Sequence, residues 1–130
     1  MTGGPVSEDQ LEEAITRYLE VVLPDDCVAF HIPNGARCSR SQALKLKRAG
    51  MKDGIPDRGV LYGGITYYIE AKRPKIIGVQ EKGQLRPSQK KTFPEMEQAG
   101  AFIRVCYSLE DVEAALIAFG IPLKRRVFRW

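Results

Sequence analysis

Apolar and polar residues follow one another in a pattern that predicts a helix at the start of the chain. Ser7, with Gln10 three residues later, has the spacing of a capping box, in which each side chain binds the other residue's backbone N–H. Apolar residues then recur every three or four positions, as they do on one face of a helix. They are Leu11, Ile15, Tyr18, Leu19 and Val22. Pro24 and the two acids after it are expected to end this helix.

The rest of the chain divides into elements of both kinds. Short apolar runs bounded by Gly, Pro or Asn predict strands, and longer stretches with helical spacing predict helices. The expected strands span 27–32, 57–62, 65–72 and 102–106, and the expected helices span 39–49, 87–99 and 108–119. The first strand is expected to be buried. Pro94 should kink the third helix or delay its start, because an interior proline removes a backbone hydrogen bond. This order predicts an α/β domain around a mixed sheet.

The length and composition fit one compact domain. A chain of 130 residues with 44% hydrophobic and 28% charged residues has an ordinary globular balance. We expect a single domain over 1–130, with a core of about 7–119 and a basic, aromatic tail over 120–130. The apolar runs are too short for a membrane helix, and the first residues lack the pattern of a signal peptide. Three scattered cysteines fit a reducing compartment, so the expected location is the cytoplasm.

The charges are divided unevenly along the chain, although the formal net charge is only +4. Residues 1–36 hold seven acids and one base, a net of −6, and residues 37–130 hold nineteen bases and nine acids, a net of +10; the two sum to +4. A basic surface of this kind favours a polyanionic partner such as nucleic acid. A solvated surface beside one acidic helix is the alternative.

A tight hairpin is expected to bring two acids into opposition. With Gly63 and Gly64 as a two-residue turn, Asp57 lies opposite Glu70, and Lys72 follows on the same face as Glu70. Facing carboxylates repel each other, whereas a divalent cation between them would turn the repulsion into coordination. Hard oxygen ligands suit Mg²⁺ or Mn²⁺. The alternatives are a surface hairpin with an ordinary Glu–Lys ladder, or a register shifted by one residue.

The first helix offers a further acid close to its apolar stripe. Glu8 lies about 35° from the centre of the stripe and Glu12 about 75°. An acid so near an apolar stripe is unusual for a solvated face, so Glu8 is a candidate to point inward at a cation. Favourable placement of acids near the positive end of a helix is the alternative.

These residues together resemble the signature of a known nuclease superfamily. Asp57, preceded by Ile55-Pro56, stands thirteen residues before Glu70 in Ile69-Glu70-Ala71-Lys72, and this arrangement is similar to the PD-(D/E)XK motif. More narrowly, the chain resembles the virus-type replication-repair nuclease (VRR-NUC) domain over about residues 7–117. The stretches that fit this domain are Ser7-Glu8, His31-Ile32-Pro33-Asn34-Gly35, Gly54-Ile55-Pro56-Asp57, Leu85-Arg86-Pro87-Ser88-Gln89 and Ala99-Gly100.

The resemblance implies a fold and a metal site. The fold would be the restriction-endonuclease-like αβββαβ core, a mixed central sheet flanked by helices, with one extra helix over 39–49. Asp57 and Glu70 would bind Mg²⁺ or Mn²⁺, joined by the carbonyl of Ala71 and by the first-helix acid, which is Glu8 or, as the fallback, Glu12.

The resemblance also implies catalytic residues and a substrate. Lys72 would help to activate water, and Gln89 would lie near the active site. The implied activity is metal-dependent hydrolysis of phosphodiester bonds in branched DNA, by a bacterial or phage-type homodimer similar to small Holliday-junction resolvases. A flap or other structure-specific nuclease is the nearest alternative, and a nucleic-acid-binding module without cleavage is another.

The basic residues around the hairpin then become the expected DNA-binding surface, which would recognise shape more than sequence. These residues are Asn34, Arg37, Arg40, Lys45, Lys47, Lys52, Arg73 and Lys75. Another metal site is conceivable, because one histidine and three cysteines could in principle bind zinc. Their spacing lacks a C-x-x-C pair, which weighs against it. They are Cys27, His31, Cys38 and Cys106.

Overall fold

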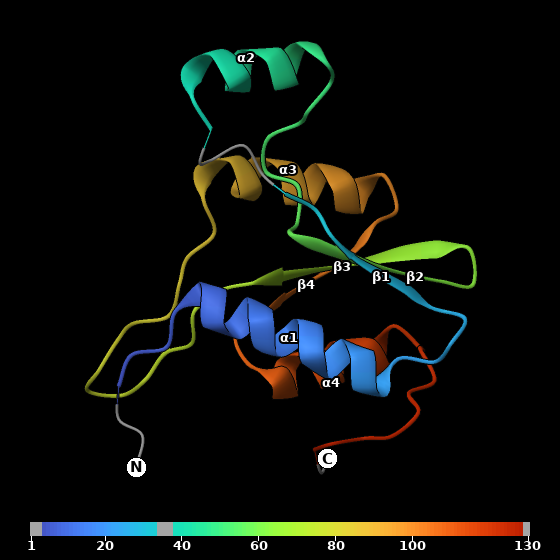
Figure 1. Ribbon diagram of the computed structural model, residues 1–130. Coiled ribbons are helices and arrows are strands. Elements are labelled where there is room, and N and C mark those ends of the chain that lie inside the picture. Colours follow the sequence, from blue (N-terminus) through green and yellow to red (C-terminus); the bar gives the residue numbers. More distant parts are fainter. Residues whose placement is uncertain (1–3, 34–37, 129–130) are drawn as a thin grey trace.

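The computed structural model describes residues 4–33 and 38–128, which form four helices and four strands (Figure 1). In chain order these are α1 (Glu8–Val22), β1 (Val28–His31), α2 (Arg40–Arg48), β2 (Arg58–Tyr62), β3 (Ile65–Ala71), α3 (Pro87–Gln98), β4 (Phe102–Cys106) and α4 (Leu109–Ala118). The kinds of element and their order are those that the sequence predicts. None of these helices is long and apolar enough to cross a membrane.

The four strands form one mixed sheet in the order β1-β2-β3-β4. β2 pairs antiparallel with β1 and β3, whereas β4 pairs parallel with β3. The β2–β3 register runs from Tyr62 opposite Ile65 to Arg58 opposite Ile69, as the two-residue turn predicts. Gly63 and Gly64 both have positive φ, 60° and 83°, which this kind of hairpin turn requires. The predicted hairpin is therefore confirmed.

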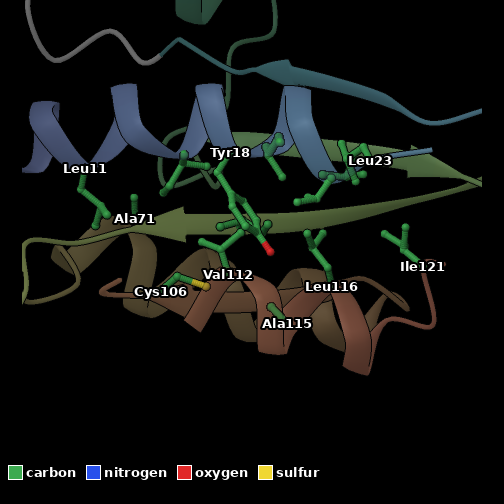
Figure 2. Close-up of a cluster of buried hydrophobic side chains, with 14 residues drawn as sticks. Leu11, Tyr18, Leu23, Ala71, Cys106, Val112, Ala115, Leu116 and Ile121 are labelled. Carbon is green, nitrogen blue, oxygen red and sulfur yellow. The ribbon is translucent and has the colours of Figure 1, made fainter. Parts of the chain in front are cut away.

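Helices cover both faces of the sheet. Figure 1 shows α1 and α4 on one side and α3 on the other, with α2 standing apart beyond α3. The main apolar core lies where α1 and α4 meet β2, β3 and β4 (Figure 2). The apolar stripe predicted on α1 is entirely buried there, and Ser7 and Gln10 form the predicted capping box. α2 has no buried residue, so the sheet and the core do not depend on it.

The core also contains one buried acid. Glu113 on α4 is fully buried and accepts hydrogen bonds from the Tyr18 hydroxyl at 2.5 Å and from the backbone N–H groups of Val127 and Phe128 at 2.8 and 2.9 Å. Burying a carboxylate costs free energy unless such donors satisfy it. The segment after α4 is thereby held against the core as far as Phe128.

Two expectations about individual elements are wrong. β1 is a strand, but all four of its residues are exposed; it lies at one edge of the sheet and pairs with β2 alone among the described strands. α3 runs unbroken from Pro87 to Gln98, so the expected delayed start is wrong, whereas a kink at Pro94 stays a prediction. Pro94 is exposed, and the carbonyl of Lys90, which loses its helical partner, belongs to an exposed residue as well.

Candidate metal centre

Three acids from three elements meet at one end of the sheet. Glu8 is the first residue of α1, Asp57 directly precedes β2, and Glu70 is the penultimate residue of β3. One carboxylate oxygen from each lies within 4.8 Å of the other two. Asp57 and Glu70 are buried, with 7% and 2% of their surface exposed, whereas Glu8 is exposed. Within residues 4–33 and 38–128, no other set of three His, Cys, Asp or Glu residues comes together in this way.

The hairpin fixes the positions of two of these acids. The last β2–β3 pair is Arg58 with Ile69, which places Asp57 beside Glu70 just beyond it. The Asp57 N–H donates to Oε1 of Glu70 at 3.0 Å, and the Ala71 N–H donates to Oδ2 of Asp57 at 3.1 Å. Each carboxylate is therefore held through the backbone of the other strand, and rotation of either side chain would break a buried hydrogen bond.

An ion pair that the sequence analysis did not identify orients α1 over the hairpin. Arg58 is 5% exposed, and its Nη2 lies 2.9 Å from Oε1 of Glu12 and 3.2 Å from the Glu12 carbonyl. Its Nη1 also donates to the Thr16 hydroxyl at 3.3 Å. Glu12, the fallback ligand, is engaged by Arg58 and also lies beside Asp57. The acid cluster includes Glu8, and the choice of Glu8 over Glu12 as a metal ligand stays a prediction. The sequence contains one sign of this ion pair: Arg58 is a basic residue directly after Asp57, at the start of an apolar strand.

Crowding of the acids shifts their protonation. Burial, a hydrogen bond with Glu12 and the charges of Glu70 and Glu12 raise the pKa of Asp57 to about 9, although the Ala71 N–H opposes the shift. Burial also raises the pKa of Glu8, against the lowering effect of Lys72. Oδ1 of Asp57 is buried and accepts no hydrogen bond. An acid cluster with an unpartnered buried oxygen fits a hard divalent cation, which would supply the missing positive charge and take that oxygen as a ligand.

Lys72 lies beside the acid cluster, as its spacing from Glu70 predicts. Its side chain is 7% exposed, and Nζ lies 3.3 Å from Oε2 of Glu70 and 4.0 Å from Oε1 of Glu8. The Lys72 N–H donates to the carbonyl of Cys106, which continues the parallel pairing of β3 with β4. The amine is therefore held at the rim of the cluster by two of its three acids.

The two other residues singled out by the resemblance have different surroundings. Ala71 is buried in the core and donates its N–H to Asp57, and a role for its carbonyl stays a prediction. Gln89, in the first turn of α3, is fully buried. Its Oε1 accepts the Arg86 N–H at 2.9 Å, whereas its Nε2 has no hydrogen-bond partner. That atom and Oδ1 of Asp57 are the two unpartnered buried side-chain atoms in the described part of the chain.

α3 is fixed against the loop that carries Asp57. Gly54 has φ +81°, and a Cβ at this position would lie 2.3 Å from the backbone oxygen of Ser88. The Thr92 hydroxyl donates to the carbonyl of Asp53 at 2.9 Å. Only glycine allows this close approach, which gives a physical reason for Gly54 in the stretch Gly54-Ile55-Pro56-Asp57.

The described members of the expected DNA-binding set are exposed; some lie on or after α2 and the others directly after β3. Asn34 and Arg37 lie outside the described residues. A cleft of about 450 Å³ between α2 and the start of α3 is lined in part by Lys47, Lys52 and Arg86. Lys47 pairs with Asp53 at 3.2 Å, and Arg73 donates to the carbonyl of Glu81 at 3.1 Å. The exposed members of the expected set are Arg40, Lys45, Lys47, Lys52, Arg73 and Lys75.

The residues of the alternative zinc site do not gather in the structure. Cys106 is buried in the core, whereas Cys27 and Cys38 are partly exposed, and among the described residues the acid cluster is the one candidate metal group. His31 ends β1, is paired with Arg58, and lines a hollow between β1 and α1. It is not part of the acid cluster.

Comparisons with known proteins identify the fold. No family model and no curated protein matches the sequence. The chain is similar to a solved structure described as a "VRR_NUC domain protein", with a TM-score of 0.63 and 20% sequence identity over 87% of each chain. A likeness of this extent at so low an identity establishes the fold: an α/β domain with a mixed sheet, of the VRR-NUC kind.

Proposed function

We propose that this chain is a metal-dependent nuclease that hydrolyses phosphodiester bonds in DNA. The observation that carries the proposal is the meeting of Glu8, Asp57 and Glu70 beside the Lys72 amine, in a fold of the VRR-NUC kind. The exposed bases on α2 and after β3 support a phosphate-rich substrate, since DNA-binding affinity comes largely from phosphate contacts.

Each residue of the site has a distinct role in this proposal. Asp57 and Glu70, held rigidly by backbone donors, would hold Mg²⁺ or Mn²⁺, and the more exposed Glu8 would complete the ligand set from the solvent side. A bound divalent cation polarises the phosphate and lowers the pKa of its water. Lys72 orients the attacking water or neutralises charge that develops on the phosphate oxygens. Gln89, with an unpartnered Nε2, positions the substrate or the water.

The proposed substrate is branched DNA, with a Holliday junction as the first candidate and a flap as the second. A homodimer suits a junction, because two equivalent strands must be cut by two equivalent sites. A binding module without cleavage is less well supported, because the three acids and Lys72 stand together here with their mutual contacts intact.

The decisive experiment removes one ligand at a time. We expect Asp57→Ala and Glu70→Ala to lower Mg²⁺- or Mn²⁺-dependent cleavage at least a hundredfold, because a rigidly held metal ligand is lost, while DNA binding stays within about threefold. Cleavage of four-way, flap and linear duplex DNA is measured with the metal and with EDTA.

Glu13→Ala is the matched control, since Glu13 is an exposed acid of α1 outside the cluster. Full cleavage by the Asp57→Ala protein would refute the proposal. Binding of branched DNA by the unaltered protein with no cleavage under any metal would favour the binding module instead.

A further inference from the structure

A loop directly after the candidate metal centre presents apolar side chains to solvent. This loop, residues 75–81, is separated from Lys72 by two residues and includes Ile77, which is 90% exposed, and Val79, which is 43% exposed. A single exposed apolar residue is ordinary on a protein surface. Two at one loop tip, beside a basic surface and a candidate active site, indicate a contact that the metal centre does not explain.

The loop is held in a defined shape. Ile76 and Gln80 exchange backbone hydrogen bonds of 2.9 Å in both directions, and Gly78, with φ 76°, provides the left-handed turn between them. The Gln80 side chain donates to the carbonyls of Pro74 at 2.6 Å and Val6 at 3.1 Å, and accepts the Val6 N–H at 3.0 Å. The apolar tip is therefore presented by a fixed frame, which reduces the entropy lost on contact with a partner.

The base of the loop is connected to the candidate metal centre. The Gly83 N–H donates to the Arg73 carbonyl at 2.9 Å and closes the loop, and a Cβ on Gly83 would lie 3.3 Å from Cβ of Lys72. In Figure 1 the tip of this loop and α2 lie on opposite sides of the region where α1 and α3 begin. A nucleic acid placed across the acid cluster would therefore have the basic α2 on one side and the apolar tip on the other.

The charges around the tip indicate the chemistry of its partner. Arg73, Lys75 and Lys82 are exposed along the loop, with Glu81 as the one acid within it. An apolar tip among bases fits an anion that also exposes flat apolar surface. Apolar side chains of other proteins insert between the base steps of duplex DNA, where they must first unstack the bases at a cost of about a few kcal/mol per step. A branch point already interrupts the stack, so the same insertion costs less there.

We propose that Ile77, supported by Val79, is a wedge that packs against the exposed base at a branch point of DNA lying across the acid cluster. The wedge deepens the proposed function and rests on it for the placement of the DNA. It makes the 75–81 loop the part of the chain that distinguishes branched from linear DNA, while the bases of α2 bind both alike.

The test replaces the wedge and follows the base beside the branch. Ile77→Ser is expected to weaken binding of four-way or flap DNA about tenfold, with less than twofold change for linear duplex of the same length, because insertion into linear duplex would first require unstacking of its bases. The fluorescence of 2-aminopurine placed at the branch should change on binding of the unaltered protein and not on binding of the variant. All binding is measured in EDTA, so that cleavage does not interfere.

Ile65→Ser is the matched control, because Ile65 is 45% exposed at the opposite end of β3, in the β2–β3 hairpin. It should leave both affinities and the fluorescence signal unchanged.

Three outcomes would each overturn the wedge: equal losses on branched and linear DNA, no loss with Ile77→Ser, or no DNA binding by the unaltered protein. Binding to phosphatidylserine vesicles that Ile77→Ser abolishes, without a preference for branched DNA, would overturn it in favour of a membrane contact. Branched-DNA binding that depends on Ile77 but is never followed by cleavage would refute only the proposed nuclease activity.

Discussion

Hydrogen bonds hold the Asp57 side chain in place, but its surroundings disfavour the negative charge of its ionised form. Two backbone hydrogen bonds link it to Glu70 and Ala71, yet burial and neighbouring acids raise its pKa from 3.8 to about 9. Between these two pH values the unfolded chain releases the proton and the folded chain keeps it. In the absence of a cation, the free energy of unfolding therefore falls as the pH rises from about 4 to about 9.

This linkage predicts that Asp57→Asn stabilises the metal-free protein. An amide removes the unfavourable charge, and its NH₂ group can donate to the neighbouring carboxylates. We expect the free energy of unfolding at pH 8 to rise by on the order of 2 kcal/mol, with a smaller gain at pH 5, because one pKa unit corresponds to about 1.4 kcal/mol and relaxation of the cluster recovers part of it. Urea unfolding in EDTA at the two pH values measures the difference.

Asp53→Asn is the control: it changes an exposed acid of the same loop and should alter the free energy of unfolding little at either pH. A variant less stable than the unaltered protein at pH 8 would contradict the prediction.

Some site residues could be predicted from the sequence because local geometry determines them. The two-glycine turn fixes the register and so places Asp57 beside Glu70, and the helical spacing of the apolar stripe places Glu8 toward the sheet. The buried pair of Arg58 with Glu12 could not be predicted in this way, because it depends on how α1 lies over β2. That packing is a tertiary property with no local pattern.

At the scale of elements, one glycine fixes α3 relative to the loop that carries Asp57. Gly54→Ala would place a Cβ 2.3 Å from the Ser88 backbone oxygen in addition to the cost of a positive φ. We expect it to lower the free energy of unfolding by roughly 2–4 kcal/mol and to reduce cleavage by displacing Asp57.

Gly50→Ala separates the two contributions. Gly50 also has a positive φ, +104°, but a Cβ there would have nothing within 4 Å, so this variant should lose only about 1 kcal/mol. Thermal or urea unfolding of both variants measures the difference between them. Equal losses would show that backbone strain alone, and not the contact with α3, accounts for the effect at Gly54.

The helices and strands could be predicted from local sequence signals more readily than the burial of each element. The capping box at Ser7 and the paired glycines mark where elements begin and end, and these local signals hold in the structure. The exposure of β1 was not predictable, because an apolar run specifies a strand without specifying whether it lies at the centre or the edge of a sheet. An interior proline costs about 3 kcal/mol in helix propensity, yet α3 continues through Pro94, because tertiary context can override local propensity.

At the scale of the whole molecule, a group of acids and a group of bases lie on different elements. Glu8 of α1 meets Asp57 and Glu70 of the hairpin in the candidate metal centre, whereas α2 carries bases on a helix without a buried residue. The mixed α/β fold follows from the order of the elements, but the distance of α2 from the core does not, since nothing in its amphipathic pattern distinguishes a packed helix from a projecting one.

The basic residues of α2 allow a test of whether this helix contacts the phosphates of DNA. If Arg40 and Lys45 each neutralise one phosphate, replacing both with Gln should make the slope of log affinity against log salt less negative by about 2, because each phosphate contact contributes about 0.9. Stability should not change, since α2 buries no residue. Replacing Arg17 on α1 and Lys124 after α4 with Gln removes the same charge far from α2 and should leave the slope unchanged (Figure 1). Titrations of labelled duplex over a range of salt concentrations supply both slopes. A slope that responds equally to both double variants would mean that net charge attracts the DNA and that α2 makes no specific contact.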